Sequence, residues 1–177
     1  MEMMDLSSYR GKKNVVLYFY PKDGTPACTI QAIGFSDREA EFKKLDTVVF
    51  GVSRDDVLSH QAFRDTHGLT VELLADTEAE VCKLYDVIQN KIVDGHPKSC
   101  LLRSTFIIDK KGVVQQETVN NLDFGRNIEE TLRLIDALQH SEEHGEVCPA
   151  GWNKGKGAMK ANPQGVASYL KENAAKL

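Results

Sequence analysis

Apolar residues cluster in short runs along the chain, and these runs predict the strands of a sheet. Residues 14–20 and 47–52 are continuously apolar and rich in valine and aromatic side chains, which is typical of strands buried on both faces. Shorter runs bounded by turn residues predict further strands at 73–75 and 104–109, and 113–119 is expected to be a strand that returns after a tight turn. The last two are separated by Lys110-Lys111-Gly112, and we therefore expect them to form a hairpin.

Between these runs the apolar residues recur at helical spacing. In segment 28–45, Ser36 and Glu39 form a capping-box sequence close to Gly34, which predicts that the helix is interrupted and restarts there. A second helix is expected to end at Gly68, where a left-handed residue is favoured. The last helix of this region has the most regular apolar stripe, formed by Ile128, Leu132, Ile135 and Leu138.

Strands and helices thus alternate, which predicts an α/β fold with a central mixed sheet flanked by helices. Segment 86–103 contains Gly95 and Pro97 and is expected to be an irregular loop or a weak hairpin. Residues 140–177 are rich in glycine and proline, with helical character only at 166–177. We therefore expect a domain at 1–139 and a C-terminal arm at 140–177.

Composition excludes several classes of function. A chain of 177 residues has room for a substantial core, and its net charge of −4 gives no reason to expect nucleic acid as a partner. No apolar run is long enough to span a bilayer, so no membrane association is expected. The first residues lack the pattern of a signal peptide, and the expected location is the cytoplasm.

The cysteines do not form a metal-binding or dithiol motif. No two of them have C-x-x-C spacing, and none of the five histidines pairs with a cysteine at ligand spacing. No glycine-rich nucleotide loop is present either. We therefore expect neither a metal nor an organic cofactor, and we expect the histidines to be surface or cap residues. The cysteines are Cys28, Cys82, Cys100 and Cys148.

Cys28 has the position of a nucleophile. It follows a turn-rich segment after the first strand and lies in the first turn of an expected helix, where an anion such as a thiolate is favoured. Thr25 offers a hydroxyl on the same side of the turn, and Cys148 on the arm offers a second sulfur. The alternative is that Cys28 simply packs in the core, as free cysteines commonly do.

The spacing Pro21-x-x-x-Thr25-x-x-Cys28 resembles the active-site motif of the peroxiredoxins. Further similar blocks stand at 32–38 and 103–109, and the segment 130–152 resembles the C-terminal signature of the typical two-cysteine type, the alkyl hydroperoxide reductase C or thiol-specific antioxidant family. The turn Pro-Lys-Asp-Gly-Thr-Pro is closer to the bacterioferritin-comigratory branch.

This resemblance implies a thioredoxin-like fold and a thiol-dependent peroxidase. Cys28 would attack hydrogen peroxide or an organic hydroperoxide and become a sulfenic acid. Thr25 would position the thiolate and the peroxide, Pro21 would shield the pocket from water, and Arg103 would stabilise the thiolate and the transition state. Cys148 would resolve the sulfenic acid as a disulfide.

The resemblance also implies partners. These are a second copy in a homodimer or in a ring of dimers, and thioredoxin or a similar dithiol protein as the reductant. The alternative functions are a peroxide sensor and an oligomeric holdase chaperone. We expect Cys82 to be a core residue, although it could be a resolving cysteine within the same subunit, and we expect Cys100 to be a bystander.

Two departures from the family pattern carry predictions. Gln31 stands where the family has a glutamate, which removes one charge from the network around Cys28. The Gly-Gly-Leu-Gly motif of easily overoxidised relatives is absent, and residues 67–70, His-Gly-Leu-Thr, stand in its neighbourhood instead. In the tail, Tyr169-Leu170 replaces the usual Tyr-Phe. We therefore expect an enzyme that resists overoxidation.

Overall fold

A computed structural model describes residues 3–93 and 95–173 of the chain. It divides the chain into two compact units, Met1–Ile128 and Glu129–Leu177. The predicted boundary between residues 139 and 140 lies within helix α5 (Ile128–His144), and the division into 1–139 and 140–177 stays a prediction. None of the helices in the described ranges is long and apolar enough to cross a bilayer.

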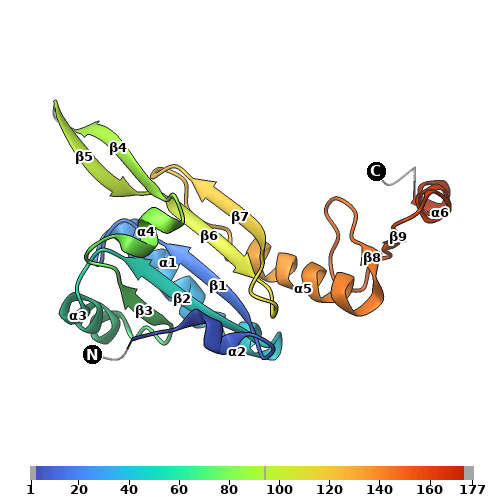
Figure 1. The fold of residues 1–177 in the computed structure, drawn as a ribbon, viewed down its shortest axis with the longest axis horizontal. Helices are drawn as coiled ribbons and strands as arrows, with labels where there is room; N and C mark the ends of the chain where they lie inside the picture. Colours follow the sequence, from blue (N-terminus) through green and yellow to red (C-terminus); the bar gives the residue numbers. More distant parts are fainter. Residues whose placement is uncertain (1–2, 94, 174–177) are drawn as a thin grey trace. The chain divides into compact units, whose positions relative to one another are not determined.

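The first unit is built on a five-stranded mixed sheet in the order β3-β2-β1-β6-β7 (Figure 1). The three strands β1, β2 and β3 run parallel to one another, whereas β6 is antiparallel to both β1 and β7. This mixed sheet with flanking helices confirms the predicted fold class. The strands are β1 (Asn14–Phe19), β2 (Thr47–Ser53), β3 (Glu72–Ala75), β6 (Arg103–Ile108) and β7 (Val114–Asn120).

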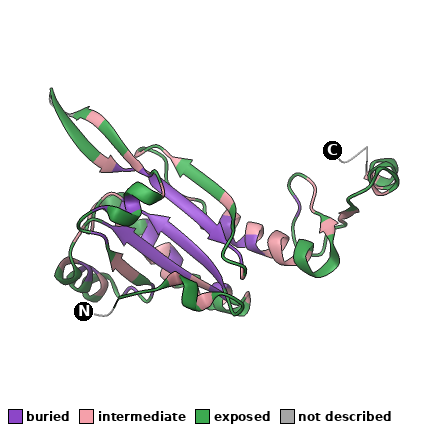
Figure 2. Cartoon of the chain, viewed as in Figure 1, coloured by how far each residue is buried: buried purple, intermediate pink, exposed green. Residues whose placement is uncertain are grey.

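The central strand β1 is buried on both faces, as its continuous apolar sequence predicts. Val15, Leu17 and Phe19 belong to a hydrophobic cluster that also contains Phe50 of β2 and Phe106 of β6. The alternate residues of β1 contact a second aromatic layer, in which Tyr18 stacks on Phe35 with ring centroids 4.4 Å apart. Figure 2 shows that buried residues are concentrated in β1, β2 and β6.

Close packing between neighbouring strands explains why position 51 is a glycine. Gly51 lies opposite Tyr18 in the pairing of β1 with β2. A Cβ atom at position 51 would lie 2.6 Å from the hydroxyl of Tyr18, so a larger residue there would displace the aromatic layer.

The helix predicted in segment 28–45 and the helix predicted to end at Gly68 are both present, with one correction. The helix after the first strand runs through Gly34 and breaks at Arg38, not at Gly34. The predicted capping box is wrong, because the Ser36 hydroxyl donates to the carbonyl of Ala32 and accepts from the amide of Thr70. The helices are α1 (Pro26–Asp37), α2 (Glu39–Lys44), α3 (Val57–His67) and α4 (Glu80–Leu84), preceded by a 3-10 turn, η1 (Leu6–Tyr9).

Helix α3 ends at Gly68, which adopts a left-handed conformation as predicted. The weak hairpin expected in segment 86–103 is a two-stranded antiparallel sheet of β4 (Ile88–Val93) and β5 (His96–Leu101). It extends away from the main sheet in Figure 1, and most of its residues are exposed in Figure 2.

The second unit consists of α5, the two-residue strands β8 (Glu146–Val147) and β9 (Met159–Lys160), and α6 (Pro163–Asn173). Trp152, the only tryptophan of the chain, is 2% exposed in the loop between β8 and β9. Its indole Nε1 donates to the carbonyl of Lys156. The predicted helix at 166–177 corresponds to α6, and its last four residues lie outside the described residues.

Candidate active site

The turn between β1 and α1 places Cys28 in the first turn of the helix. Gly24 has a φ of +67°, a left-handed conformation that favours glycine and reverses the chain direction. Thr25 is the N-cap residue with extended backbone angles, and Pro26 takes the first helical position, where its missing N–H costs no hydrogen bond. Cys28 therefore lies among the amides at the positive end of the helix dipole.

Arg103 is the direct partner of the Cys28 sulfur. The Arg103 Nη1 donates to the Cys28 Sγ across 3.3 Å, and its Nε donates to the carbonyl of Leu122 at 2.7 Å. Arg103 is 6% exposed and Cys28 is 2% exposed, so this contact is shielded from water. Low water access strengthens the interaction between a guanidinium and a thiolate. The structure thus brings together two predicted site residues that are far apart in the sequence.

Thr25 and Pro21 lie in the same turn, but neither makes a hydrogen bond to the Cys28 sulfur in this structure. The Thr25 hydroxyl donates to the carbonyl of Lys22 at 3.1 Å, and the Thr25 carbonyl accepts from the amide and the hydroxyl of Thr29. Pro21 is half-buried, two residues after the end of β1. In this conformation Thr25 stabilises the turn and the start of α1.

A second arginine, Arg126, was missed by the sequence analysis. From the loop after β7, its Nε donates to the Thr105 hydroxyl at 2.9 Å. Its Nη2 donates to the carbonyls of Phe19 and Ser104, and the guanidinium lies 5.2 Å from the ring centre of Tyr18. One side chain thus connects the ends of β1 and β6. No motif marks this arginine, because its partners are mostly backbone carbonyls.

Arg126 also belongs to the electrostatic environment of Cys28. Burial lowers the pKa of the Arg126 guanidinium to about 10; Tyr18 and Cys28 oppose this shift, whereas Arg103 adds to it. The guanidinium therefore remains charged at neutral pH. Two cations thus act on the one thiol.

Gln31 contributes an amide to this network. Its Oε1 accepts from the Arg126 Nη1, and its Nε2 donates to the carbonyl of Ala27 one turn earlier in α1. An amide can make both bonds at once because it carries a donor and an acceptor. Because Gln31 is neutral, it adds no negative charge beside the Arg126 guanidinium.

The active-site turn is held to α3 by a buried network around Asp23. The Asp23 carboxylate accepts from the Tyr20 hydroxyl and the Ser59 hydroxyl, each at 2.7 Å, and lies 2.8 Å from the His60 Nδ1. The amide of Asp23 donates to the carboxylate of Asp55 at 2.9 Å.

His60 is 3% exposed, so the prediction that all histidines are surface or cap residues is wrong for this one. Its place in the network explains the difference, because a buried imidazole is stabilised by a carboxylate partner.

Cys82 and Cys100 differ in their surroundings. Cys82 is fully buried in the hydrophobic cluster, as predicted, and its amide donates to the Asp76 carboxylate at 2.7 Å. Burial and the nearby Asp76 raise the pKa of the Cys82 thiol well above its ordinary value. Cys100 is half-buried on β5, and its thiol donates to the carbonyl of Gln89 at 3.4 Å.

Cys148 lies in the second unit, in the loop that follows β8. It is half-buried, and its thiol donates weakly to the carbonyl of Ala137 on α5 at 3.6 Å. Burial raises the pKa of the Cys148 thiol; Arg133 opposes this rise, and Glu146 adds to it. All four cysteines are free thiols in this structure.

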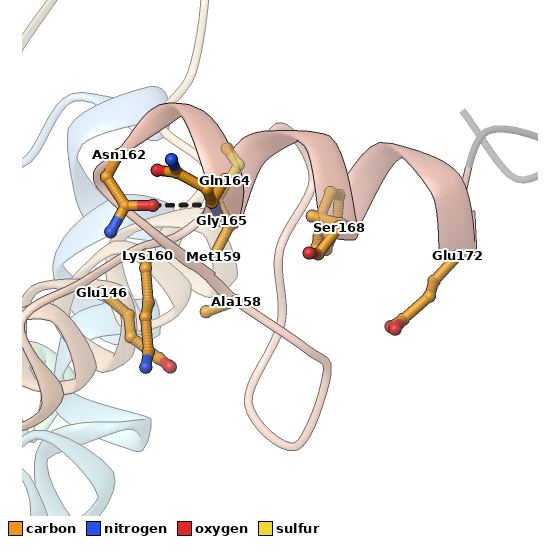
Figure 3. Close-up of a pocket in the computed structure, with 10 residues that line it drawn as sticks. Glu146, Ala158, Met159, Lys160, Asn162, Gln164, Gly165, Ser168 and Glu172 are labelled. Carbon is orange, nitrogen blue, oxygen red and sulfur yellow. Dashed lines mark hydrogen bonds between the residues drawn. The ribbon is translucent and has the colours of Figure 1, made fainter.

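The second unit also contains an open cavity of about 490 Å³, shown in Figure 3. It lies between α6 and the two short strands, and the Asn162 side chain accepts from the amide of Gly165 at its edge. Its lining contains both polar and apolar side chains but no cysteine and no arginine, so the thiol chemistry is located elsewhere. Among the described residues, no group of histidine, cysteine and carboxylate side chains is arranged to hold a metal ion.

Comparison with known proteins identifies the family. The sequence profile of the AhpC/TSA family matches residues 1–117, and that of the C-terminal domain of 1-Cys peroxiredoxin matches residues 137–172. The chain is 43% identical over 172 residues to the chloroplastic 2-Cys peroxiredoxin BAS1 of Hordeum vulgare, covering 93% of this chain and 79% of that protein. It is 42% identical to alkyl hydroperoxide reductase C of Helicobacter pylori over 183 residues, which cover 99% of this chain and 89% of that protein.

Solved structures agree with this assignment. The reduced 2-Cys peroxiredoxin of Plasmodium vivax is 38% identical with a TM-score of 0.83, covering 95% of this chain and 87% of that one. The bacterioferritin comigratory protein of Xanthomonas campestris is 31% identical with a TM-score of 0.68, covering 77% and 82%. These comparisons confirm the thioredoxin-like fold and the resemblance to both branches. The chain belongs to the AhpC/TSA family of peroxiredoxins and is a thiol-dependent peroxidase.

Proposed function

We propose that Cys28 is the residue that reduces the peroxide. Its thiolate attacks one oxygen of the O–O bond, and that bond breaks. The sulfur is oxidised by two electrons to a sulfenic acid, and the other oxygen leaves as water or an alcohol after taking a proton. The observation that carries this proposal is the 3.3 Å contact between the Arg103 guanidinium and the Cys28 sulfur.

Arg103 has two roles in this reaction. It donates to the sulfur before the reaction, and it stabilises the negative charge that develops on the leaving oxygen. Arg126 adds a second positive charge that interacts with Cys28. Thr25 and Pro21 complete the pocket, with the Thr25 hydroxyl able to turn from the Lys22 carbonyl toward a bound peroxide.

We further propose that Cys148 resolves the sulfenic acid, in preference to Cys82. A thiol attacks as its thiolate, so burial beside an anion disfavours it. Cys82 is fully buried beside the Asp76 carboxylate, whereas Cys148 is half-buried and has Arg133 as a charged neighbour. Cys28 is itself buried, so the first turn of α1 must open before a second sulfur can reach it.

In this proposal the Cys148 that reacts belongs to a partner subunit. The chain acts as a homodimer or as a ring of dimers, and thioredoxin or a similar dithiol protein reduces the disulfide by thiol exchange. The substrates are hydrogen peroxide and small organic hydroperoxides, and the location is the cytoplasm. The names of the relatives, 2-Cys peroxiredoxin and alkyl hydroperoxide reductase C, support the two-cysteine cycle and organic hydroperoxides as substrates.

A non-reducing gel tests the assignment of the two sulfurs. The wild type, Cys148→Ser and Cys82→Ser are each treated with one equivalent of hydrogen peroxide and then with an alkylating reagent. We expect a covalent dimer in the wild type and in Cys82→Ser, and none in Cys148→Ser. A dimer band that persists in Cys148→Ser would refute the role of Cys148.

Turnover separates the peroxidase cycle from the alternative roles of sensor or holdase. Thioredoxin, its reductase and NADPH are mixed with a catalytic amount of the protein, and NADPH consumption is followed after peroxide is added. We expect sustained turnover that is lost in Cys28→Ser. A single stoichiometric burst would contradict recycling by thioredoxin and would favour a sensor.

A further inference from the structure

One face of helix α5 carries three successive residues that make polar contacts, and the last of them contacts Cys148. Glu130, Arg133 and Ala137 are spaced by three and four residues, which places them one above another on a helix. The Arg133 Nε and Nη2 donate to the two oxygens of Glu130 at 2.6 and 2.7 Å. The Cys148 thiol contacts the carbonyl of Ala137, one turn further along.

Arg133 also fixes the loop that contains Cys148. Its third nitrogen, Nη1, donates to the carbonyl of Trp152 at 2.6 Å. The loop is further fixed by the burial of the Trp152 side chain and by the bond from its indole to Lys156. A guanidinium that is held at Glu130 and at Trp152 has little freedom to move away from Cys148.

Two charged side chains act on Cys148, with opposite signs. Arg133 on α5 favours the thiolate, and Glu146 on β8 disfavours it. Glu146 in turn lies 2.9 Å from the His140 Nε2, and Arg133 is paired with Glu130. The cationic and anionic neighbours of the sulfur are thus each held by a partner on α5.

We propose that Arg133 is a positioning residue for the resolving step: it holds the 148–152 loop on α5 and favours the thiolate of Cys148. This inference rests on the proposed role of Cys148. In the step, the Cys148 thiolate attacks the sulfur of the Cys28 sulfenic acid and a disulfide bond forms. Hydroxide leaves and takes up a proton to give water, so no other oxidant or reductant is needed.

The size of the effect follows from the thiolate fraction. Loss of the Arg133 charge lowers the thiolate fraction of Cys148 at neutral pH, and the greater nucleophilicity of a more basic thiolate offsets only part of this loss. We therefore expect Arg133→Gln to slow the resolving step about threefold at pH 7. A slower resolving step also leaves the sulfenic acid exposed to a second peroxide for longer, so sulfinic acid at Cys28 increases by a similar factor.

The test measures resolution separately from peroxide reduction. Each variant is oxidised with one equivalent of hydrogen peroxide and stopped with acid at intervals, and mass spectrometry quantifies sulfenic acid and disulfide. The rate of disulfide formation is recorded from about pH 6 to about pH 10, a range that spans the ordinary thiol pKa. Emission of Trp152, the only tryptophan, reports whether the loop keeps its fold.

We expect Arg133→Gln to shift the midpoint of this pH profile upward, Glu146→Gln to shift it downward, and Arg133→Lys to keep it near the wild-type value. Opposite shifts from two charges cannot come from a loss of packing. Asp136→Asn is the matched control, because it breaks the ion pair with Lys154 on the same helix and should leave the profile unchanged.

The outcomes separate this inference from the proposal on which it rests. A disulfide that still forms in Cys148→Ser would overturn the proposed role of Cys148. If the disulfide is lost in Cys148→Ser, but Arg133→Gln has the wild-type midpoint or Arg133→Lys behaves like Arg133→Gln, only the role of Arg133 is overturned.

Discussion

The Arg103 guanidinium donates to the Cys28 sulfur across 3.3 Å and thereby connects the first residue of β6 to the first turn of α1. Because β6 pairs with the central strand β1, the position of the cation is set by the sheet. The sulfur receives a fixed positive charge from the sheet and a partial positive charge from the helix dipole. Such a fixed charge stabilises a transition state without reorganisation.

Replacing Arg103 should therefore slow peroxide reduction far more than it changes folding. We expect Arg103→Gln to lower the second-order rate constant for Cys28 oxidation about 100-fold, the typical effect of losing one charge-stabilising donor. Arg103→Lys should recover part of the rate. Stopped-flow measurement in a Cys148→Ser background isolates this step, and Arg64→Gln, at a partly exposed ion pair of α3, serves as the control. A rate within twofold of wild type would contradict the assigned role.

Arg126 should contribute to stability as well as to the site. Its guanidinium binds two backbone carbonyls, a threonine hydroxyl and the Gln31 amide. Arg126→Gln leaves these acceptors without a charged donor and should lower the free energy of unfolding by about 2 kcal/mol. Urea denaturation measures this change. Arg64→Gln, which removes an exposed ion pair, should change stability by less than about 0.5 kcal/mol. Equal losses of unfolding free energy in the two variants would show that the hydrogen bonds of Arg126 do not stabilise the fold.

The Asp23 network predicts a loss of stability in acid. Burial alone would raise the pKa of Asp23, but hydrogen bonds from His60, Ser59 and Tyr20 outweigh it and hold the pKa below the ordinary value. A lowered carboxyl pKa contributes stability above the unfolded value of about 3.9, and this contribution is lost as the pH falls through the folded value.

We therefore expect Asp23→Asn to be about 2 kcal/mol less stable than wild type at pH 7 and to differ less below about pH 4. Denaturant titrations at several pH values measure the difference. His60→Gln serves as a second probe of the same network. A stability difference that stays constant between about pH 7 and about pH 3 would argue against the charged form of Asp23.

Resistance to overoxidation is a separate prediction from the sequence. With a recycling system present, we expect Cys28 to remain free of sulfinic acid at micromolar peroxide. Mass spectrometry of the Cys28 peptide during a peroxide titration provides the measurement. Sulfinic acid that appears at micromolar peroxide would contradict the prediction.

Local sequence patterns predicted most of the fold because the determinants are local. The buried strands β1 and β2 are continuous apolar runs, and Gly68 marks the end of α3 through its left-handed backbone. The capping box failed because the Ser36 hydroxyl bonds within its own helix and to Thr70, a residue far along the chain. The short stretch of sequence around Ser36 contains no information about Thr70.

The same distinction applies to the site. The motif around Cys28 and the resemblance that accompanies it led to Arg103, which the structure places on the sulfur. Arg126 and His60 were missed because their roles depend on which side chains and carbonyls the tertiary fold brings near them. A lone arginine in a loop and a histidine in a helix have no distinctive local pattern.

The β4–β5 hairpin has a consequence for association and proteolysis. In the part of the chain that the structure describes, its two strands pair only with each other, so each has one free edge. Lys91 and Lys98 stand opposite each other across the hairpin. Such charges discourage edge-to-edge aggregation, and an isolated two-stranded ribbon is marginally stable. Its amide protons should therefore exchange early, and trypsin should cut there before it cuts the central sheet.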